Sequence, residues 1–269
     1  MWESKLTTKH MQAIKFWWRS PQLGLTFATA LLVGTGLASG QDQGAAATNA
    51  PAKNPWETTA AAGLTLTRGN SRTMLATLSL DTKRKWDDNE AAFGATGGYG
   101  EDKDVRNADF ATAFGQYNRM LTERFYVGLR ASFYYDGIAD LSYRVTISPL
   151  AGYYLVKTTN TTLAVEAGPA FVEEKYYHQT PDGYWGFRAG ERFEHKLSAT
   201  TKIWESVSYV PQVDRWAEKY IVTGEAGIDA AITKQWSLRV VFQDIYDSQP
   251  ANGRQKNDVR LIAGTAYKF

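Results

Sequence analysis

Two histidines, His178 and His195, are the side chains after residue 55 best suited to acid–base chemistry. A hydrolase of the serine type would place a histidine beside a serine and a carboxylate or amide. His195 shares strand parity with several aromatic residues, which favours an interfacial position. His178 lies in a long aromatic connection, 174–185, where Pro181-Asp182-Gly183 favours a turn. We therefore expect no catalytic residue and no enzyme, although a lipid-modifying enzyme using His178 stays open as an alternative.

Three acids, Asp244, Asp247 and Asp258, lie near one another in the sequence and could supply oxygen ligands. A Ca²⁺ site needs several such oxygens in converging geometry, and their spacing matches no known binding loop. The chain has no cysteine, so thiolate metal sites are excluded. Gly69-Asn70 is explained as a tight turn, with Ser71 structural. We expect no metal and no cofactor.

A larger set of charged residues recurs at alternate positions within apolar segments. A buried charge must pair with an opposite charge or stay hydrated. If these groups pair, they plug and stiffen whatever encloses them; if they line a wetted path, they form a narrow channel with a preference among solutes. Arginine outnumbers the acids, which favours an anionic solute. The set comprises Arg130, Arg144, Glu166, Arg188, Arg192, Glu225, Asp229, Arg239 and Arg260.

The elements that position these charges have a period of two residues. In RFYVGLRASFYYDG (124–137), every second residue from Phe125 is apolar or tyrosine, and the alternate set contains Arg130, Ser132 and Asp136. This alternation predicts a strand with opposite faces. We expect the face of Phe125 to contact lipid, and the face of Arg130 and Ser132 to line a polar lumen. The run 141–147 predicts the same arrangement, with Leu141, Tyr143, Val145 and Ile147 outward.

About twelve such runs follow residue 56, each of about 10–14 residues, which is enough for a tilted strand to cross a bilayer. Lipid offers no partner to backbone groups, so the sheet must close. We therefore predict an all-β, transmembrane, antiparallel up-and-down β-barrel of about twelve strands, with ten as the fallback because the run at 203–210 alternates poorly. Compact turns (85–89, 120–123, 157–161, 197–201, 233–235) alternate with longer connections (101–107, 174–183, 211–218, 248–257), as in outer-membrane barrels.

The two ends of the chain agree with an outer-membrane destination. A basic segment, an apolar segment and small residues predict a cleaved signal peptide over 1–40. Residues 41–55 have no periodicity and predict a flexible periplasmic tether, followed by the barrel over 56–269. The terminal pair Tyr267 and Phe269 resembles the signal by which outer-membrane barrels are recognised for insertion.

The charge distribution argues against nucleic-acid binding. The chain has a net charge of +2, but its first 40 residues carry +3, so the remainder carries −1. A domain without a basic surplus lacks the electrostatic attraction that phosphate backbones require.

Four ordered segments carry a family resemblance. They are WETTAAAGLTLTRGNSRT (56–73), EAGP (166–169), RAGERFEHKLS (188–198) and the ending from DSQP (247–250) through KND (256–258) to YKF. The set, spread over residues 55–269, resembles the YdiY-like salt-induced outer-membrane proteins, domain-of-unknown-function family 481. The resemblance implies an outer-membrane barrel of Gram-negative bacteria with no assigned activity, and carries over no catalytic residues.

These observations together predict an outer-membrane barrel acting either as a narrow pore for small, anionic solutes or as a structural protein of the envelope. A barrel that binds or adheres through the predicted extracellular loop 174–185 stays as an alternative. The expected partners are outer-membrane lipid and the barrel-assembly machinery during biogenesis, and the expected state is a monomer, because no run offers a distinct flat apolar contact surface.

Overall fold

The computed structural model describes residues 56–67 and 73–269. The predicted signal peptide (1–40), the tether (41–55) and the turn at 69–71 lie outside the described residues.

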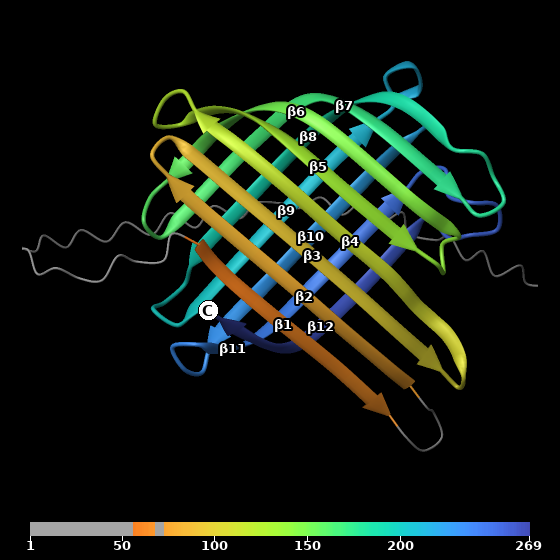
Figure 1. Cartoon of the computed structure of the whole chain (residues 1–269), viewed down its shortest axis with the longest axis horizontal. Coiled ribbons are helices and arrows are strands. Elements are labelled where there is room, and N and C mark those ends of the chain that lie inside the picture. Colours follow the sequence, from red (N-terminus) through yellow and green to blue (C-terminus); the bar gives the residue numbers. More distant parts are fainter. Residues whose placement is uncertain (1–55, 68–72) are drawn as a thin grey trace, which may run out of the picture. The chain divides into compact units, whose positions relative to one another are not determined.

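Twelve antiparallel strands form a closed barrel in the described part of the chain, each pairing with the next in sequence and β1 pairing with β12 (Figure 1). The predicted fold class is therefore confirmed with twelve strands, and the fallback of ten is wrong. The bounds are β1 (Trp56–Thr67), β2 (Thr73–Trp86), β3 (Asn89–Asp102), β4 (Val105–Met120), β5 (Phe125–Asp136), β6 (Leu141–Lys157), β7 (Thr161–Tyr176), β8 (Asp182–Lys196), β9 (Thr201–Pro211), η1 (Val213–Arg215), β10 (Tyr220–Ala231), β11 (Trp236–Asp247) and β12 (Asn257–Lys268).

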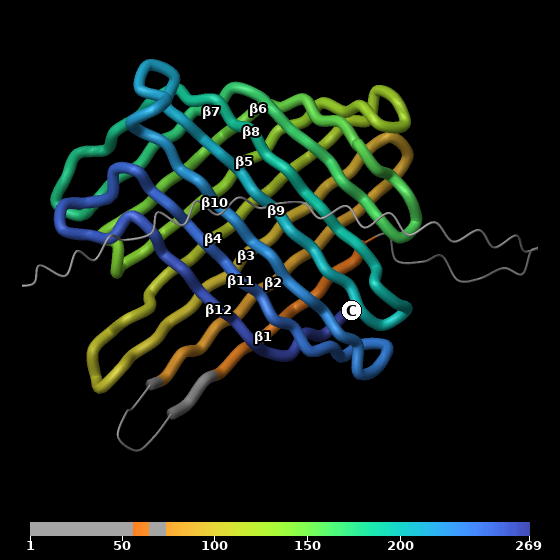
Figure 2. The backbone as a smooth tube through the Cα atoms, turned by 180° about the vertical axis from the view of Figure 1, so that it is seen from behind, coloured from red at the N-terminus to blue at the C-terminus, as the bar shows by residue number. Residues whose placement is uncertain are grey.

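The strands are steeply tilted, so those of the near and far walls cross in projection (Figure 2). This tilt allows the sheet, whose strands are 11–17 residues long, to close into a barrel. Within residues 56–67 and 73–269, no helix has the length and apolar character to cross a bilayer.

We call the two rims of the barrel the turn end and the loop end. The turn end holds the start of β1, the end of β12 and the connections 87–88, 121–124, 158–160, 197–200 and 232–235. The loop end holds the described connections 103–104, 137–140, 177–181, 212–219 and 248–256.

The predicted alternation of short and long connections is only partly correct. The expected long segment 101–107 is a two-residue turn, because Lys103 and Asp104 both adopt positive φ (50° and 66°), as a tight hairpin requires. The expected loop 174–185 shrinks to 177–181, since β7 continues to Tyr176 and β8 starts at Asp182. The longer connections that remain are 212–219 and 248–256.

The outer face of the barrel is apolar around its circumference. Phe125, Val127, Leu129 and Phe133 of β5 are 37–50% exposed, whereas Tyr126 on the opposite face is fully buried. The predicted orientation of this strand therefore agrees with its burial. Further exposed apolar side chains include Leu64, Leu78, Phe93, Ile147, Trp185, Phe187, Leu238 and Leu261.

Leu141 is an exception to the predicted faces. It is only 2% exposed, although Val145 and Ile147 of the same strand point outward. The register of β6 against β7 shifts between Leu141 and Tyr143, and such a bulge reverses the alternation at the strand's start. The expected outward position of Leu141 is therefore wrong.

β9 shows why its sequence alternates poorly. Trp204 faces inward, where its indole N–H donates to Glu225 at 3.2 Å. Glu205 consequently faces outward, opposite Phe193 and Ala226 of the neighbouring strands. A large aromatic residue inside and a carboxylate outside invert the usual pattern.

Interior glycines make room for the large lumenal rings. A Cβ at Gly227 of β10 would collide with the Trp204 ring, and one at Gly152 of β6 would collide with the Tyr126 ring. Tyr126 can therefore lie against the wall beside Tyr154, with ring centroids 5.3 Å apart. These rings narrow the interior and help to position its charged groups.

Candidate functional site in the barrel lumen

The lumen contains a cavity of about 770 Å³. Its rim includes residues 198–200 and 233–235 of the turn end, while no residue of the described loop-end connections lines it. Arg144, Val210 and Ile245 belong to its opposite, inner end. The cavity is therefore a cup that reaches the turn end and stops short of the loop end.

A buried carboxylate, Glu166 of β7, organises the middle of the lumen. Its side chain is 0% exposed and forms ion pairs with Arg188 at 3.0 Å and Arg192 at 2.8 Å, both on β8. Gln116 of β4 donates to the same carboxylate at 2.6 Å, and the Tyr126 hydroxyl donates at 2.9 Å. Four donors from three strands satisfy the carboxylate, so its burial is compensated.

Arg130 of β5 joins this cluster indirectly. Its guanidinium donates to the Gln116 side-chain oxygen at 2.9 Å and lies over the Phe114 ring, 4.4 Å from the centroid. Among the described residues, Arg130 forms no ion pair with a carboxylate. We call Arg130, Arg188 and Arg192 the arginine trio; all three line the cavity, whereas Glu166 does not.

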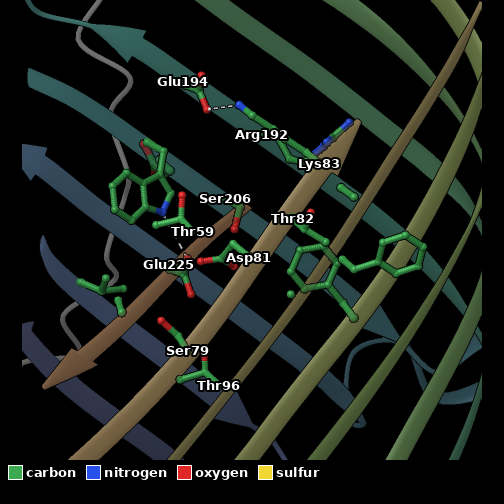
Figure 3. A pocket seen from close by; sticks show the side chains of 18 of the residues that line it. Thr59, Ser79, Asp81, Thr82, Lys83, Thr96, Arg192, Glu194, Ser206 and Glu225 are labelled. Atoms are coloured by element: carbon green, nitrogen blue, oxygen red, sulfur yellow. Dashed lines mark hydrogen bonds and ion pairs between the residues drawn. The ribbon is translucent and has the colours of Figure 1, made fainter. Parts of the chain in front are cut away.

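A second network lies nearer the turn end. Arg239 of β11 forms two hydrogen bonds with Asp229 (2.8 and 3.0 Å) and one with Asp81 of β2 (2.9 Å). Lys83 of β2 pairs with Glu194 of β8 at 3.5 Å, across six positions of the ring of twelve strands. Figure 3 shows Asp81 and Lys83 of β2 and Glu194 of β8 entering the cavity from separate strands.

A third network crosses the barrel at the loop end. Arg144 of β6 pairs with Glu174 of β7 at 2.7 Å and with Asp247 of β11, five strand positions away. Arg260 of β12 pairs with Asp136 of β5, again across the barrel. We call these five residues the loop-end layer. The cavity ends at this layer, so its ion pairs narrow the lumen at the loop end.

All nine charged residues singled out by the alternation lie on the inner face of the barrel. The structure divides eight of them among the three networks rather than gathering them in one site. Glu225 stands apart from the ion pairs and accepts hydrogen bonds from Trp204 at 3.2 Å and Gln243 at 2.8 Å.

The nine candidates omitted several lumenal partners of the same parity, although the alternation in 124–137 had already placed Asp136 on the inward face. Asp136 lies on the inward face of the very strand that carries Arg130. A complete list of inward polar positions would have included Asp136 and the other omitted partners. It would not have shown which lumenal charges pair with each other. The missed residues are Asp81, Lys83, Gln116, Tyr126, Asp136, Glu174, Glu194, Lys202 and Asp247.

The alternative chemistries find little geometric support in the described residues. The imidazole of His195 shares a 2.7 Å hydrogen bond with Thr161, and neither described histidine contacts a serine. Of the three acids considered as metal ligands, Asp247 pairs with Arg144, and Asp244 lies on the outward face of β11. Residues 56–67 and 73–269 hold no group of three potential ligands arranged for a metal ion.

The comparisons with known proteins identify one sequence family and several distant barrels. The model of a family described as "Protein of unknown function, DUF481" matches residues 60–269. No curated protein matches the sequence. Among solved structures, the translocator domain of the autotransporter NalP from Neisseria meningitidis is 14% identical, with a TM-score of 0.46, over 81% of this chain and 90% of that one. The KdgM porin is 12% identical (TM-score 0.42; 80% and 99%), and the NanC porin 8% (0.44; 79% and 96%).

Proposed function

The chain belongs to the DUF481 family of proteins of unknown function, as its sequence resemblance predicted, and we propose that it is a barrel of the Gram-negative outer membrane whose lumen admits small anionic solutes. The observation that carries the proposal is the charge of the cavity. Leaving out Arg84, Glu191 and Glu205, which lie on outward strand faces, eleven lysines and arginines line it, against six aspartates and glutamates. A cavity with low-dielectric walls focuses the field of its charges, so this surplus favours anions over cations.

The outer face of the barrel supports the membrane location. Soluble monomers rarely expose large continuous apolar patches, yet Leu64, Leu78 and Leu261 are each at least 64% exposed. Outward aromatic residues also gather near both ends of the strands, as in the girdles of outer-membrane barrels. Those near the turn end include Trp56, Trp86, Trp236 and Tyr267, and those near the loop end include Tyr99, Tyr143, Trp185 and Tyr209.

An exposed aromatic pair at the last strand supports delivery by the barrel-assembly machinery. Tyr267 and Phe269 share the outward parity of β12, and their rings meet edge to face with centroids 5.0 Å apart. Phe269 is 70% exposed. An exposed aromatic pair at the end of the last strand offers an apolar feature that another protein can recognise.

The loop-end layer makes the channel narrow. Arg144, Asp247, Asp136 and Arg260 span the lumen in pairs, so a solute entering from the turn end meets charged side chains before it reaches the loop end. We therefore expect small currents rather than the conductance of an open porin. No catalytic step is part of the proposal.

The test is conductance of the purified, folded barrel in a planar bilayer under a tenfold KCl gradient. We expect small discrete steps and a reversal potential with the sign of chloride preference. Cation preference would contradict the role assigned to the basic surplus.

A second candidate function, a structural protein of the envelope, is favoured by the ion pairs that cross the lumen. It predicts a folded, inserted barrel without any current. The absence of current in the bilayer, together with high resistance to unfolding from the ion pairs across the lumen, would favour the structural role over the channel.

A further inference from the structure

The arginine trio carries positive charge that the protein does not neutralise. Arg188 and Arg192 share the single carboxylate of Glu166, and Arg130 pairs with no carboxylate of the described residues. Glu166 is 0% exposed and does not line the cavity, while all three arginines do. Toward the cavity, the cluster therefore presents three guanidinium groups backed by one negative charge.

The other inward-facing arginines that line the cavity are balanced, while Arg84 lies on the outward face of β2, over the rings of two tryptophans. Arg239 contacts two carboxylates, Asp81 and Asp229. Arg144 also contacts two, those of the loop-end layer. The surplus at the trio is therefore a local feature and not a general property of the lumenal arginines.

The rim lysines differ from the trio in their environment. Lys196, Lys234 and Lys268 also line the cavity, but they are exposed at the turn end. Water stabilises an exposed ammonium group, whereas a guanidinium inside the barrel has lost part of its hydration. An arriving anion therefore gains more at the trio than at the rim.

We propose that the arginine trio is a binding site for the carboxylate or phosphate group of a small solute. The inference rests on the proposed function, because the solute reaches the site through the lumen. The planar fork of arginine matches the two oxygens of a carboxylate or phosphate. The cavity, at about 770 Å³, lies within the usual range of small-molecule sites, roughly 300–1,000 Å³.

The site is partly organised before the anion arrives. Arg130 lies over the Phe114 ring and uses one hydrogen bond, to Gln116, of the five that its guanidinium can donate. The Nε of Arg192 is buried without a partner in the described residues. Free donors on arginines already fixed in place lower the conformational cost of binding.

The experiment is calorimetric titration of the folded full-length barrel in detergent micelles with succinate and, separately, inorganic phosphate at constant ionic strength. We expect saturable binding of at least one of the two, and the stronger ligand identifies the chemical group. Arg130→Gln should weaken that binding at least tenfold, and Arg130→Lys, which keeps the charge but loses the fork, at least threefold. Circular dichroism and heat-modified gel mobility check that each variant is folded.

Lys234→Gln is the matched control, because it removes one positive charge from the rim of the same cavity. It should change the affinity less than twofold. Equal weakening by Lys234→Gln and Arg130→Gln would overturn a discrete site in favour of a general field, and absence of saturable binding to the wild type would overturn it outright. Since the titration requires no current, a failed site leaves anion-preferring conductance standing, and a silent barrel that binds succinate or phosphate leaves the site standing.

Discussion

Replacing Arg144 by methionine tests whether the loop-end layer supports the fold. The side chains of Arg144 and its partner Glu174 are 6% and 4% exposed, and that of Asp247 is 16% exposed. Removing one member of a buried ion pair costs about 3–5 kcal/mol, because the remaining charge stays buried without its partner. Glu174 keeps a second partner, Lys219 at 2.9 Å, and the Asp247 carboxylate still accepts hydrogen bonds from the Tyr176 hydroxyl and the Gln249 backbone N–H, both at 2.9 Å. We therefore expect a loss near the lower limit, about 3 kcal/mol.

The assay is equilibrium urea unfolding of the barrel in lipid vesicles, followed by tryptophan fluorescence. The matched control is Arg254→Met, which breaks the ion pair of Arg254 with Asp140, where the two side chains are 42% and 35% exposed. Exposed pairs contribute about 0–1 kcal/mol, so the control should lie in that range. If Arg144→Met destabilised the barrel no more than Arg254→Met, lumenal water would be hydrating the layer and the argument from burial would be refuted.

A triple variant separates the lost pair from the orphaned charges. Arg144→Met combined with Glu174→Gln and Asp247→Asn removes all three charges of the Arg144 group and leaves the Arg260–Asp136 pair of the layer in place. Replacing a buried ion network by neutral groups is often close to neutral in stability, so most of the loss should be recovered. The same variant removes charged side chains that span the lumen, and its single-channel conductance should exceed that of the wild type.

Three further outcomes follow from individual contacts. Glu205→Leu should raise the unfolding free energy in vesicles by about 1–2 kcal/mol, since an outward charge in the hydrocarbon is unfavourable and acids cost less than the roughly 2–4 kcal/mol of Arg or Lys; Glu205→Gln should fall between the two. Gly152→Ala should destabilise the barrel by about 1–3 kcal/mol through its collision with the Tyr126 ring, and an unchanged urea midpoint would show that the ring has room to move. The Arg254 guanidinium holds the pKa of Asp140 below its ordinary value of 3.8. This contact therefore stabilises the loop fully above pH 3.8 and is lost as the pH falls below that value. Limited proteolysis of 248–256 should accelerate only at such acidic pH, and Asp140→Asn should remove this pH dependence.

The sequence predicts the faces of the barrel well, because alternation is a local property. Two adjacent residues on a strand must point to opposite sides, so Phe133 outside and Arg130 inside follow from the pattern alone. The errors arise where one backbone feature breaks the pattern. The bulge at Leu141 reverses one face, and the positive φ values of Lys103 and Asp104 turn an expected loop into a hairpin.

The pairing of lumenal charges is not a local property. Arg144 and Asp247 are separated by 103 positions in the sequence, and they meet because strand tilt and stagger bring β6 and β11 to the same height. The alternation places both residues inside without setting their relative heights. For this reason the nine charged positions could be predicted as lumenal, whereas the division into a central cluster, a turn-end network and a loop-end layer could not.

The positions beside the trio strengthen the interpretation of its surplus charge. Ser148 pairs with Arg130 across the β5–β6 ladder and faces the lumen, where its hydroxyl donates to the Pro169 carbonyl at 2.8 Å. Ser132, on the same face of β5, lines the cavity. An acidic residue at either position would lie close enough to neutralise Arg130, as Asp81 and Asp229 neutralise Arg239. A lumen arranged only for rigidity gains nothing from leaving a guanidinium unpaired. A lumen that binds anions needs one positive group without a carboxylate, because the solute would otherwise have to displace that carboxylate.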